Sequence, residues 1–138
     1  MITSQQIVDE ARRCIGTPWH HAGRLRGVGL DCAGLLVVVM AELGIAIIDD
    51  TMYTTGDEFN RMSGHMDVYA DRLPIDEPPR PGDVLLFRKG RMLNHCSIFT
   101  ENHTHIHVFR PLGCVEQLYD EDWAARLVVR YRYKGISE

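Results

Sequence analysis

The sequence lacks a long hydrophobic run, although 45% of its 138 residues are hydrophobic. The most apolar stretch, residues 35–41, is much shorter than the roughly 20 residues that a membrane-spanning helix needs. Residues 1–13 are polar and of mixed charge, which is unlike a secretory signal peptide. We therefore expect no membrane span, and synthesis in the cytoplasm without a signal peptide.

Clustered basic charge and paired cysteines are missing as well. The formal net charge is −4, and the basic run at residues 80–91 is balanced by acidic residues elsewhere, so nucleic acid is not an expected partner. The four cysteines include no CxxC pair, and reduced thiols are the default in a chain without a signal peptide. Three of them are predicted to be small buried residues, whereas Cys32 stands apart because of its position.

Helical periodicity occupies the first half of the chain. Residues 3–15 are predicted to form an amphipathic helix, and residues 32–43 a helix that is apolar nearly all round and therefore buried. A third helix is predicted over residues 57–71. The first two are separated by the loop "GTPWHHAGRLRGVGL", residues 16–30, whose length is unusual in a compact domain unless the loop is functional.

The second half of the chain alternates apolar and polar residues, as strands do. Five strands are predicted, at residues 84–87, 93–99, 105–109, 114–119 and 127–133. Helices followed by an antiparallel meander predict an α+β fold, in one domain over residues 1–138, with a central helix on a five- to six-stranded antiparallel sheet. Trp123 is predicted to anchor the core, and Tyr131 and Tyr133 to lie on the sheet surface.

Cys32 is the strongest candidate for a reactive residue. It occupies the first helical position after Asp31, where the helix dipole and unpaired backbone N–H groups favour the thiolate and can stabilise an oxyanion. Asp31 opposes this by charge repulsion, so a cationic partner is needed. Gly34 is predicted to leave room for a substrate. Taken alone, this position is equally compatible with a cysteine that only packs.

Two of the seven histidines are predicted to complete a catalytic group with Cys32. A turn centred on Glu101 would place His95 directly opposite His107, with Cβ atoms about 5 Å apart, so that one imidazole could bind the other. A base and an orienting residue are the second and third members of a Cys-His-X triad. A register shift by two residues would give His105 the orienting role instead, and we rank His107 first.

Three strings of the sequence carry a family resemblance. "GTPWHHAGRLRGVGLDCAGLL", "PRPGDVLLF" and "NHCSIF…HIHVF" occur in an order and spacing that resemble the NlpC family of papain-like cell-wall peptidases over about residues 7–109. The branch encoded with bacteriophage tail-tip genes is the most similar. The resemblance implies a papain-like fold without a cofactor, with Cys32 as nucleophile, His95 as general base and His107 as orienting residue.

The resemblance also implies a substrate and a biological setting. Peptidoglycan stem peptides are the implied substrate, typically cut between D-Glu and a diamino acid. Phage tail proteins are implied partners, and association with a virion, or release by lysis, would bring the enzyme to its substrate.

Two positions depart from the pattern of this family. A tyrosine that usually contributes to the oxyanion site is replaced by Trp19, which His20 follows, so an indole or imidazole N–H would have to substitute for the hydroxyl. The serine that often follows the cysteine is replaced by Ala33, although Asp31 is present. These four residues are the predicted substrate-binding positions, and a strict preference for stem peptides with a free amine does not follow.

Three alternatives to a peptidase stay open at this point. One is a tail or cell-wall binding module with an idle triad, favoured by the change to Trp19. Another is an acyltransferase, because a triad does not distinguish water from another acceptor. The third is a metal site, for which zinc would need four converging ligands; its candidates are Cys32, Cys96, His103, His105 and His107.

Overall fold

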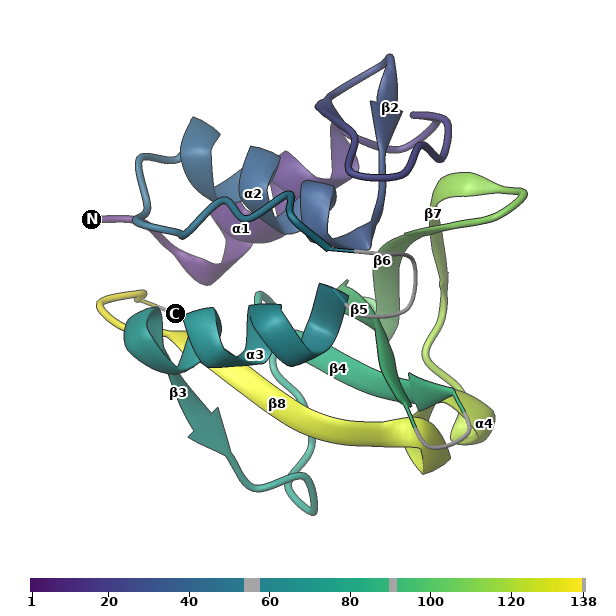
Figure 1. Cartoon of the computed structure of the whole chain (residues 1–138). Coiled ribbons are helices and arrows are strands. Elements are labelled where there is room, and N and C mark those ends of the chain that lie inside the picture. Colours follow the sequence, from purple (N-terminus) through teal and green to yellow (C-terminus); the bar gives the residue numbers. More distant parts are fainter. Residues whose placement is uncertain (54–57, 90–91, 138) are drawn as a thin grey trace.

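The computed structural model describes residues 1–53, 58–89 and 92–137, with the backbone alone for residues 58–62, 89 and 92–94. Figure 1 shows a helical layer and a twisted sheet. The elements in chain order are α1 (Ser4–Arg12), β1 (Arg24–Leu25), β2 (Gly29–Leu30), α2 (Cys32–Glu42), α3 (Glu58–Tyr69), β3 (Ala70–Leu73), β4 (Val84–Lys89), β5 (Met92–Phe99), β6 (Thr104–Phe109), β7 (Gly113–Leu118), α4 (Glu121–Arg126) and β8 (Leu127–Tyr133).

The α+β fold with a six-stranded antiparallel sheet is confirmed. The strand order is β3-β8-β4-β5-β6-β7, and the five predicted strands are found with ends within two residues of the predicted ones. The sixth strand, β3, is not among the five predicted strands, and its first two residues fall within the predicted third helix. That helix ends at Tyr69 instead, because Ala70 pairs with Tyr133 at the edge of the sheet.

The helices α1 and α2 lie side by side above the sheet (Figure 1). As predicted, α2 is buried nearly all round, and its side chains form the main core with one face of β4, β5 and β6. The opposite face of the sheet carries a smaller cluster made of Leu85, Phe87, Phe99 and Tyr119, with Trp123 packed against it. Two layers of side chains therefore flank strand β5.

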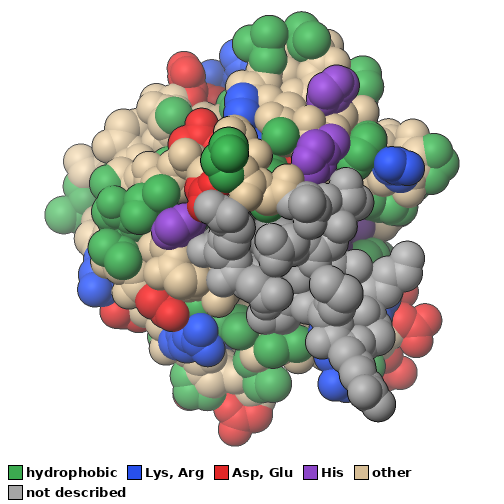
Figure 2. Space-filling view, viewed as in Figure 1, with side chains coloured by type: hydrophobic (Ala, Val, Ile, Leu, Met, Phe, Trp, Pro, Cys, Tyr) green, Lys and Arg blue, Asp and Glu red, His purple; other side chains and the backbone are tan. Residues whose placement is uncertain are grey.

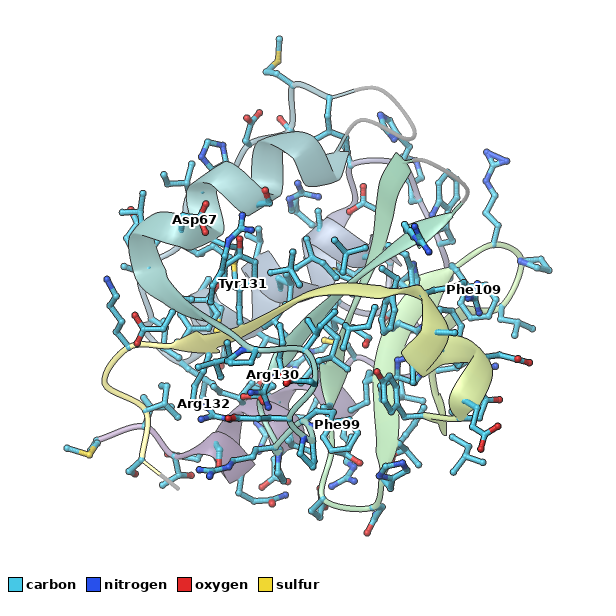
Figure 3. All side chains as sticks on the ribbon, turned by 90° about the horizontal axis from the view of Figure 1, so that it is seen from below. Asp67, Phe99, Phe109, Arg130, Tyr131 and Arg132 are labelled. Carbon is cyan, nitrogen blue, oxygen red and sulfur yellow. The ribbon has the colours of Figure 1, made fainter. Side chains whose placement is uncertain are left out.

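The prediction that Tyr131 and Tyr133 lie on the sheet surface is wrong. Both are buried, because α3 covers this part of β8. The Tyr131 hydroxyl donates to a carboxylate oxygen of Asp67 across 2.8 Å, and Figure 3 shows the two side chains directed toward one another. Alternation in the strand marked one face correctly, but it could not show that a helix covers that face.

The described ends of the chain lie together, since Thr3 forms a β-bridge with Ser137 (Figure 1). Within the described residues no helix is long and apolar enough to cross a membrane. On the described part of the face seen in Figure 2, lysine and arginine side chains are scattered and form no continuous patch.

Candidate active site

The start of α2 is held by the Asp31 carboxylate. Asp31 is the N-cap of the helix, and its Oδ1 accepts the Gly34 N–H across 2.7 Å. Its Oδ2 accepts the Ala22 N–H across 2.8 Å and the hydroxyl of Tyr53. In the first turn, the backbone N–H groups of Cys32 and Ala33 have no hydrogen-bond partner among the described residues, as is usual at the start of a helix.

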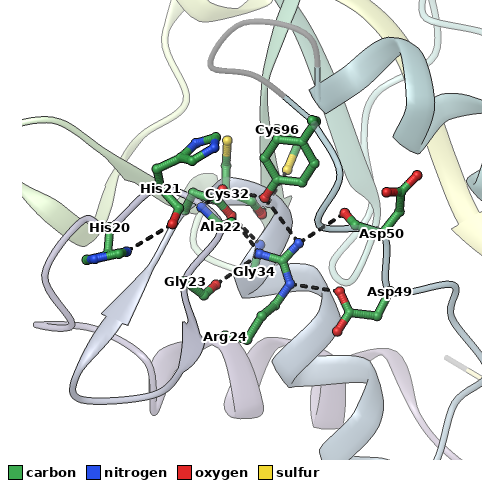
Figure 4. Close-up of polar contacts among 12 residues, drawn as sticks. His20, His21, Ala22, Gly23, Arg24, Cys32, Gly34, Asp49, Asp50 and Cys96 are labelled. Carbon is green, nitrogen blue, oxygen red and sulfur yellow. Dashed lines mark hydrogen bonds and ion pairs between the residues drawn. The ribbon is translucent and has the colours of Figure 1, made fainter.

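Arg24 places a positive charge next to Asp31, a contact that the sequence did not predict. Its guanidinium lies 3.1 Å from Asp31 Oδ1, 2.9 Å from Asp49 Oδ1 and 3.1 Å from the Tyr53 hydroxyl oxygen (Figure 4). The positive charge offsets the repulsion between Asp31 and a thiolate at Cys32. Burial and the hydrogen bond to Asp31 raise the pKa of Tyr53, so its hydroxyl stays protonated at neutral pH.

Gly34 has a different role from the one predicted. A Cβ atom at this position would lie 2.0 Å from the carbonyl oxygen of Gly23, which is an impossible contact with backbone. The glycine therefore lets the loop that carries Arg24 approach the helix, and it does not make room for a substrate.

The predicted substrate-binding residues have different surroundings. Ala33 is completely buried in the core, so neither its side chain nor its backbone is exposed to a ligand. The buried Asp31 carboxylate is already bound by four donors. The half-buried Trp19 has the Arg110 guanidinium 4.2 Å from its ring centroid, and His20 is exposed. The roles of Trp19 and His20 toward a substrate stay predictions.

The four cysteines are all buried, and Cys32 is the most exposed of them at 5%. Its backbone carbonyl accepts a hydrogen bond from the Cys96 thiol across 3.3 Å, so the first turn of α2 lies against β5 (Figure 4). The Cys32 thiol itself has no hydrogen bond to a described residue. The structure therefore places Cys32 beside the strand of His95, without a bond between the two side chains. The Cys96 side chain faces α2, whereas the His95 ring lies with Phe87 and Trp123 on the other face of the strand.

The two predicted histidines are in direct contact. His95 Nε2 lies 2.6 Å from His107 Nδ1. The predicted register is nevertheless wrong: Ile98 pairs with Ile106, so the turn is centred on residue 102 and His107 is not directly opposite His95. The contact between His95 and His107 runs diagonally across the two strands, over a distance that two imidazole rings can bridge.

His105, the alternative orienting residue, is hydrogen-bonded to Ser97 and not to His95. Its ring is fully buried, and its Nδ1 lies 2.7 Å from the Ser97 hydroxyl, while its Nε2 has no hydrogen-bond partner within the described part of the chain. It stacks on His107 with centroids 4.4 Å apart. Burial and the neighbouring His107 lower the pKa of His105 to about 3, so it is neutral at physiological pH.

Two residues beside the histidines were missed by the sequence analysis. Gln117 of β7 places its Oε1 2.8 Å from His107 Nε2. Trp123 is half-buried on α4, a helix that was not predicted, and its ring centroid lies 5.5 Å from that of His95 and 5.0 Å from that of His107. The signal that could have revealed this helix is Asp120, which caps α4 and is followed by charged residues.

Burial controls the protonation of the histidine pair. Burial lowers the pKa of His95 well below 6.5, and the fields of His107, His105 and Arg126 act in the same direction. Burial also lowers the pKa of His107 to about 4. Both rings are thus neutral at pH 7, and a neutral imidazole is the form that can accept a proton from a thiol.

Comparison with known proteins identifies the family. The family model described as NlpC/P60 matches residues 16–132, which include Cys32, His95 and His107. The chain belongs to the NlpC/P60 family. Members of this family are cysteine peptidases and hydrolases that act on peptidoglycan. A search of curated proteins gives no match.

Solved structures of NlpC/P60 proteins show the same fold. The NlpC/P60 domain of the peptidoglycan hydrolase SagA is 20% identical, with a TM-score of 0.70 over 95% of this chain and 99% of that domain. A family protein from Bacillus cereus is 17% identical, with a TM-score of 0.73 over 95% of this chain. A lipoprotein-like member from Staphylococcus aureus is 23% identical, with a TM-score of 0.65 over 98% of this chain. This chain spans only 40% and 42% of the latter two proteins.

The metal site considered as an alternative does not form in the described part of the chain. No group of three or more His, Cys, Asp or Glu side chains there is arranged to hold a metal ion. Cys96 is directed toward α2, whereas His105 and His107 lie with Phe87 and Trp123 on the other side of the sheet.

Proposed function

We propose that this NlpC/P60 domain is a cysteine peptidase that hydrolyses peptide bonds in peptidoglycan stem peptides. Cys32 is the nucleophile, His95 the general base and His107 the residue that orients it. The observation that carries the proposal is the 2.6 Å contact between His95 and His107, on the strand that lies against the first turn of the Cys32 helix. Family membership supports the reaction class.

The reaction begins with a proton transfer from the Cys32 thiol to His95 Nδ1. The thiolate attacks the amide carbonyl carbon, and the resulting oxyanion is bound by the backbone N–H group of Cys32. The carbon–nitrogen bond then breaks, and His95 returns its proton to the leaving amine. A water molecule that gives a proton to His95 hydrolyses the thioester, releases the acid and restores the thiol.

The Cys32 thiol and His95 Nδ1 must come within hydrogen-bond distance for the first step. Catalytic hydrogen bonds are often long before a substrate binds and shorten in the complex. The uncharged pair in the structure is the resting state of this scheme, since both histidines are neutral at pH 7. The resemblance over residues 7–109 supports two finer proposals: cleavage between D-Glu and a diamino acid, and an origin in a phage or prophage, with tail proteins as partners.

Digestion of a purified disaccharide-tetrapeptide, followed by mass spectrometry, tests the proposed bond. The expected products are the disaccharide carrying L-Ala-D-Glu and a dipeptide of the diamino acid and D-Ala. Products from cleavage of another bond would refute the proposed specificity but still support peptidase activity. A substrate that stays intact with the wild type would refute the peptidase and favour the binding module with an idle triad.

A further inference from the structure

Gln117 stands at the end of a hydrogen-bonded row that leads to His95. In the β6–β7 ladder Gln117 is paired with His105, yet its side chain reaches diagonally to His107. The atoms in order are Gln117 Oε1, His107 Nε2, His107 Nδ1 and His95 Nε2, with gaps of 2.8 Å and 2.6 Å between the side chains. Every member of the row is an uncharged group at neutral pH.

The direction of each hydrogen bond follows from the chemistry of the amide oxygen. An amide oxygen only accepts, so His107 Nε2 must carry the proton and donate it. A neutral imidazole has one N–H, so His107 Nδ1 is then an acceptor, and the N–H of the next contact belongs to His95 Nε2. This leaves the lone pair of His95 on Nδ1, which has no partner among the described residues.

We infer that Gln117 is a positioning residue that sets the tautomers of both histidines and so keeps His95 Nδ1 free to act as the base. The inference rests on the proposed function for its catalytic meaning, but the tautomers themselves are a property of the folded protein. The opposite assignment, with His107 donating from Nδ1, would require a proton on His95 Nδ1 and would remove its basicity.

A glutamine suits this position better than a carboxylate would. The groups that face the pair are His105 on β6 and Arg126 on α4, together with the apolar rings of Phe87, Phe109 and Trp123. A carboxylate beside His107 would favour the imidazolium form. The neutral amide fixes the direction of the row without adding a charge that would hold a proton on it.

Nitrogen-15 NMR of histidine-labelled protein tests the inference directly, because long-range proton couplings distinguish the two neutral tautomers. In the wild type at pH 7 we expect both His95 and His107 as the Nε2–H tautomer. In Gln117→Leu we expect both rings to become mixtures of the two tautomers. An Nδ1–H His107 in the wild type, or unchanged tautomers in Gln117→Leu, would overturn the inference.

Two further variants separate positioning from a merely structural role. Gln117→Glu retains an acceptor for His107, so both neutral rings should stay in the Nε2–H tautomer. The acid limb of kcat/KM should move to higher pH, because the glutamate charge favours the imidazolium form. Gln117→Leu should lower kcat by at least about tenfold with little change in KM, because an orienting partner acts on the chemical step. Leu118→Glu places the same charge on the next residue, which is exposed, and should change neither kcat nor the acid limb of kcat/KM.

The outcomes also distinguish this inference from the proposed function. If the wild type shows the expected tautomers but cleaves no muropeptide, the proposed function fails and the role of Gln117 in the row stands. If the wild type is active and Gln117→Leu and Gln117→Glu lose the same activity with no change in the pH profile, Gln117 only supports the fold and the inference fails.

Discussion

The thiol of Cys96 donates a hydrogen bond to the backbone carbonyl oxygen of Cys32 across 3.3 Å. This contact joins strand β5 to the first residue of α2, and it connects the element that carries the proposed base to the element that carries the proposed nucleophile. His95 immediately precedes Cys96, so any movement of this junction changes the position of His95 relative to the Cys32 thiol. A cysteine that has no role in the chemistry thus helps to align the site.

Replacing Cys96 with valine should therefore affect activity more than a comparable change elsewhere in the core. We expect Cys96→Val to reduce the free energy of unfolding by about 1 kcal/mol through loss of the hydrogen bond, and to lower kcat. Cys114→Val is the matched control, because Cys114 is equally buried in the same core and its thiol has no bond to a described residue. Urea unfolding and muropeptide kinetics measure both effects; equal losses of kcat in the two variants would contradict the role of this junction.

Alkylation of the native protein should be selective for Cys32. The other three thiols are at most 1% exposed, and burial raises the pKa of Cys14 to about 11 and of Cys114 to about 12, so neither forms a thiolate readily. Treatment with iodoacetamide at pH 7, followed by peptide mapping, should show label on Cys32 first. Labelling of another cysteine at the same rate, or a Cys32 that reacts no faster than a free thiol in solution, would favour an idle site.

The buried histidines should make the protein less stable in acid. The pKa of His105 is about 3 in the folded protein, against about 6.5 for a free histidine, so below pH 6.5 the unfolded chain binds a proton that the folded protein does not. The free energy of unfolding must then fall as the pH falls, with a contribution from His105 of about 1.4 kcal/mol per pH unit until the pH approaches 3.

The variant His105→Phe isolates this contribution. Urea unfolding between pH 6 and pH 4 should show a shallower dependence on pH than in the wild type. The slope carries the result, because the substitution also removes the contact with Ser97. His103→Phe changes an exposed histidine on the same hairpin and should leave the slope as it is. An unchanged slope in His105→Phe would show that His105 is protonated in the folded protein.

The hydroxyl of Tyr53 should contribute to the stability of the loop around Asp31. It donates to Asp31 and lies 3.1 Å from the Arg24 guanidinium, so Tyr53→Phe removes a buried hydrogen bond to a charged group, which is worth about 1.5–3 kcal/mol. Tyr119→Phe is the control, because Tyr119 is also buried while its hydroxyl has no hydrogen-bond partner among the described residues. Thermal and urea unfolding compare the two; equal effects would mean that the contact with Asp31 adds nothing.

The features that the sequence predicted well are those with a local pattern. The helix at Cys32 is announced by Asp31 and a run of apolar residues, and each predicted strand is found with ends within two residues of the predicted ones. The pairing of His95 and His107 was predicted from strand phase, which fixed the face correctly. The register was shifted, because the turn at residues 100–104 is held by contacts between Thr100 and Thr104 that phase does not reveal.

The features that the sequence could not show depend on contacts between distant segments. Arg24, Tyr53 and Asp31 meet only because the loop before α2 and the segment after it fold back onto one helix end. Gln117 and Trp123 reach the histidines from β7 and α4; no local pattern marks Gln117, and the local signal for Trp123 is the Asp120 cap of α4. Ala33 was assigned to a binding site because it stands where the family often has a serine, and in the structure it is buried in the core.

The central claim is that Cys32 forms a covalent bond with the substrate and that His95 activates it. Muropeptide digestion by wild type, Cys32→Ala, His95→Ala and the exposed control His103→Ala, with intact-protein mass spectrometry during turnover, tests it most directly. We expect cleavage by the wild type and His103→Ala, a transient mass increase equal to the acyl fragment in the wild type, and no turnover by folded Cys32→Ala or His95→Ala. Cleavage by purified Cys32→Ala at the wild-type rate would contradict the account.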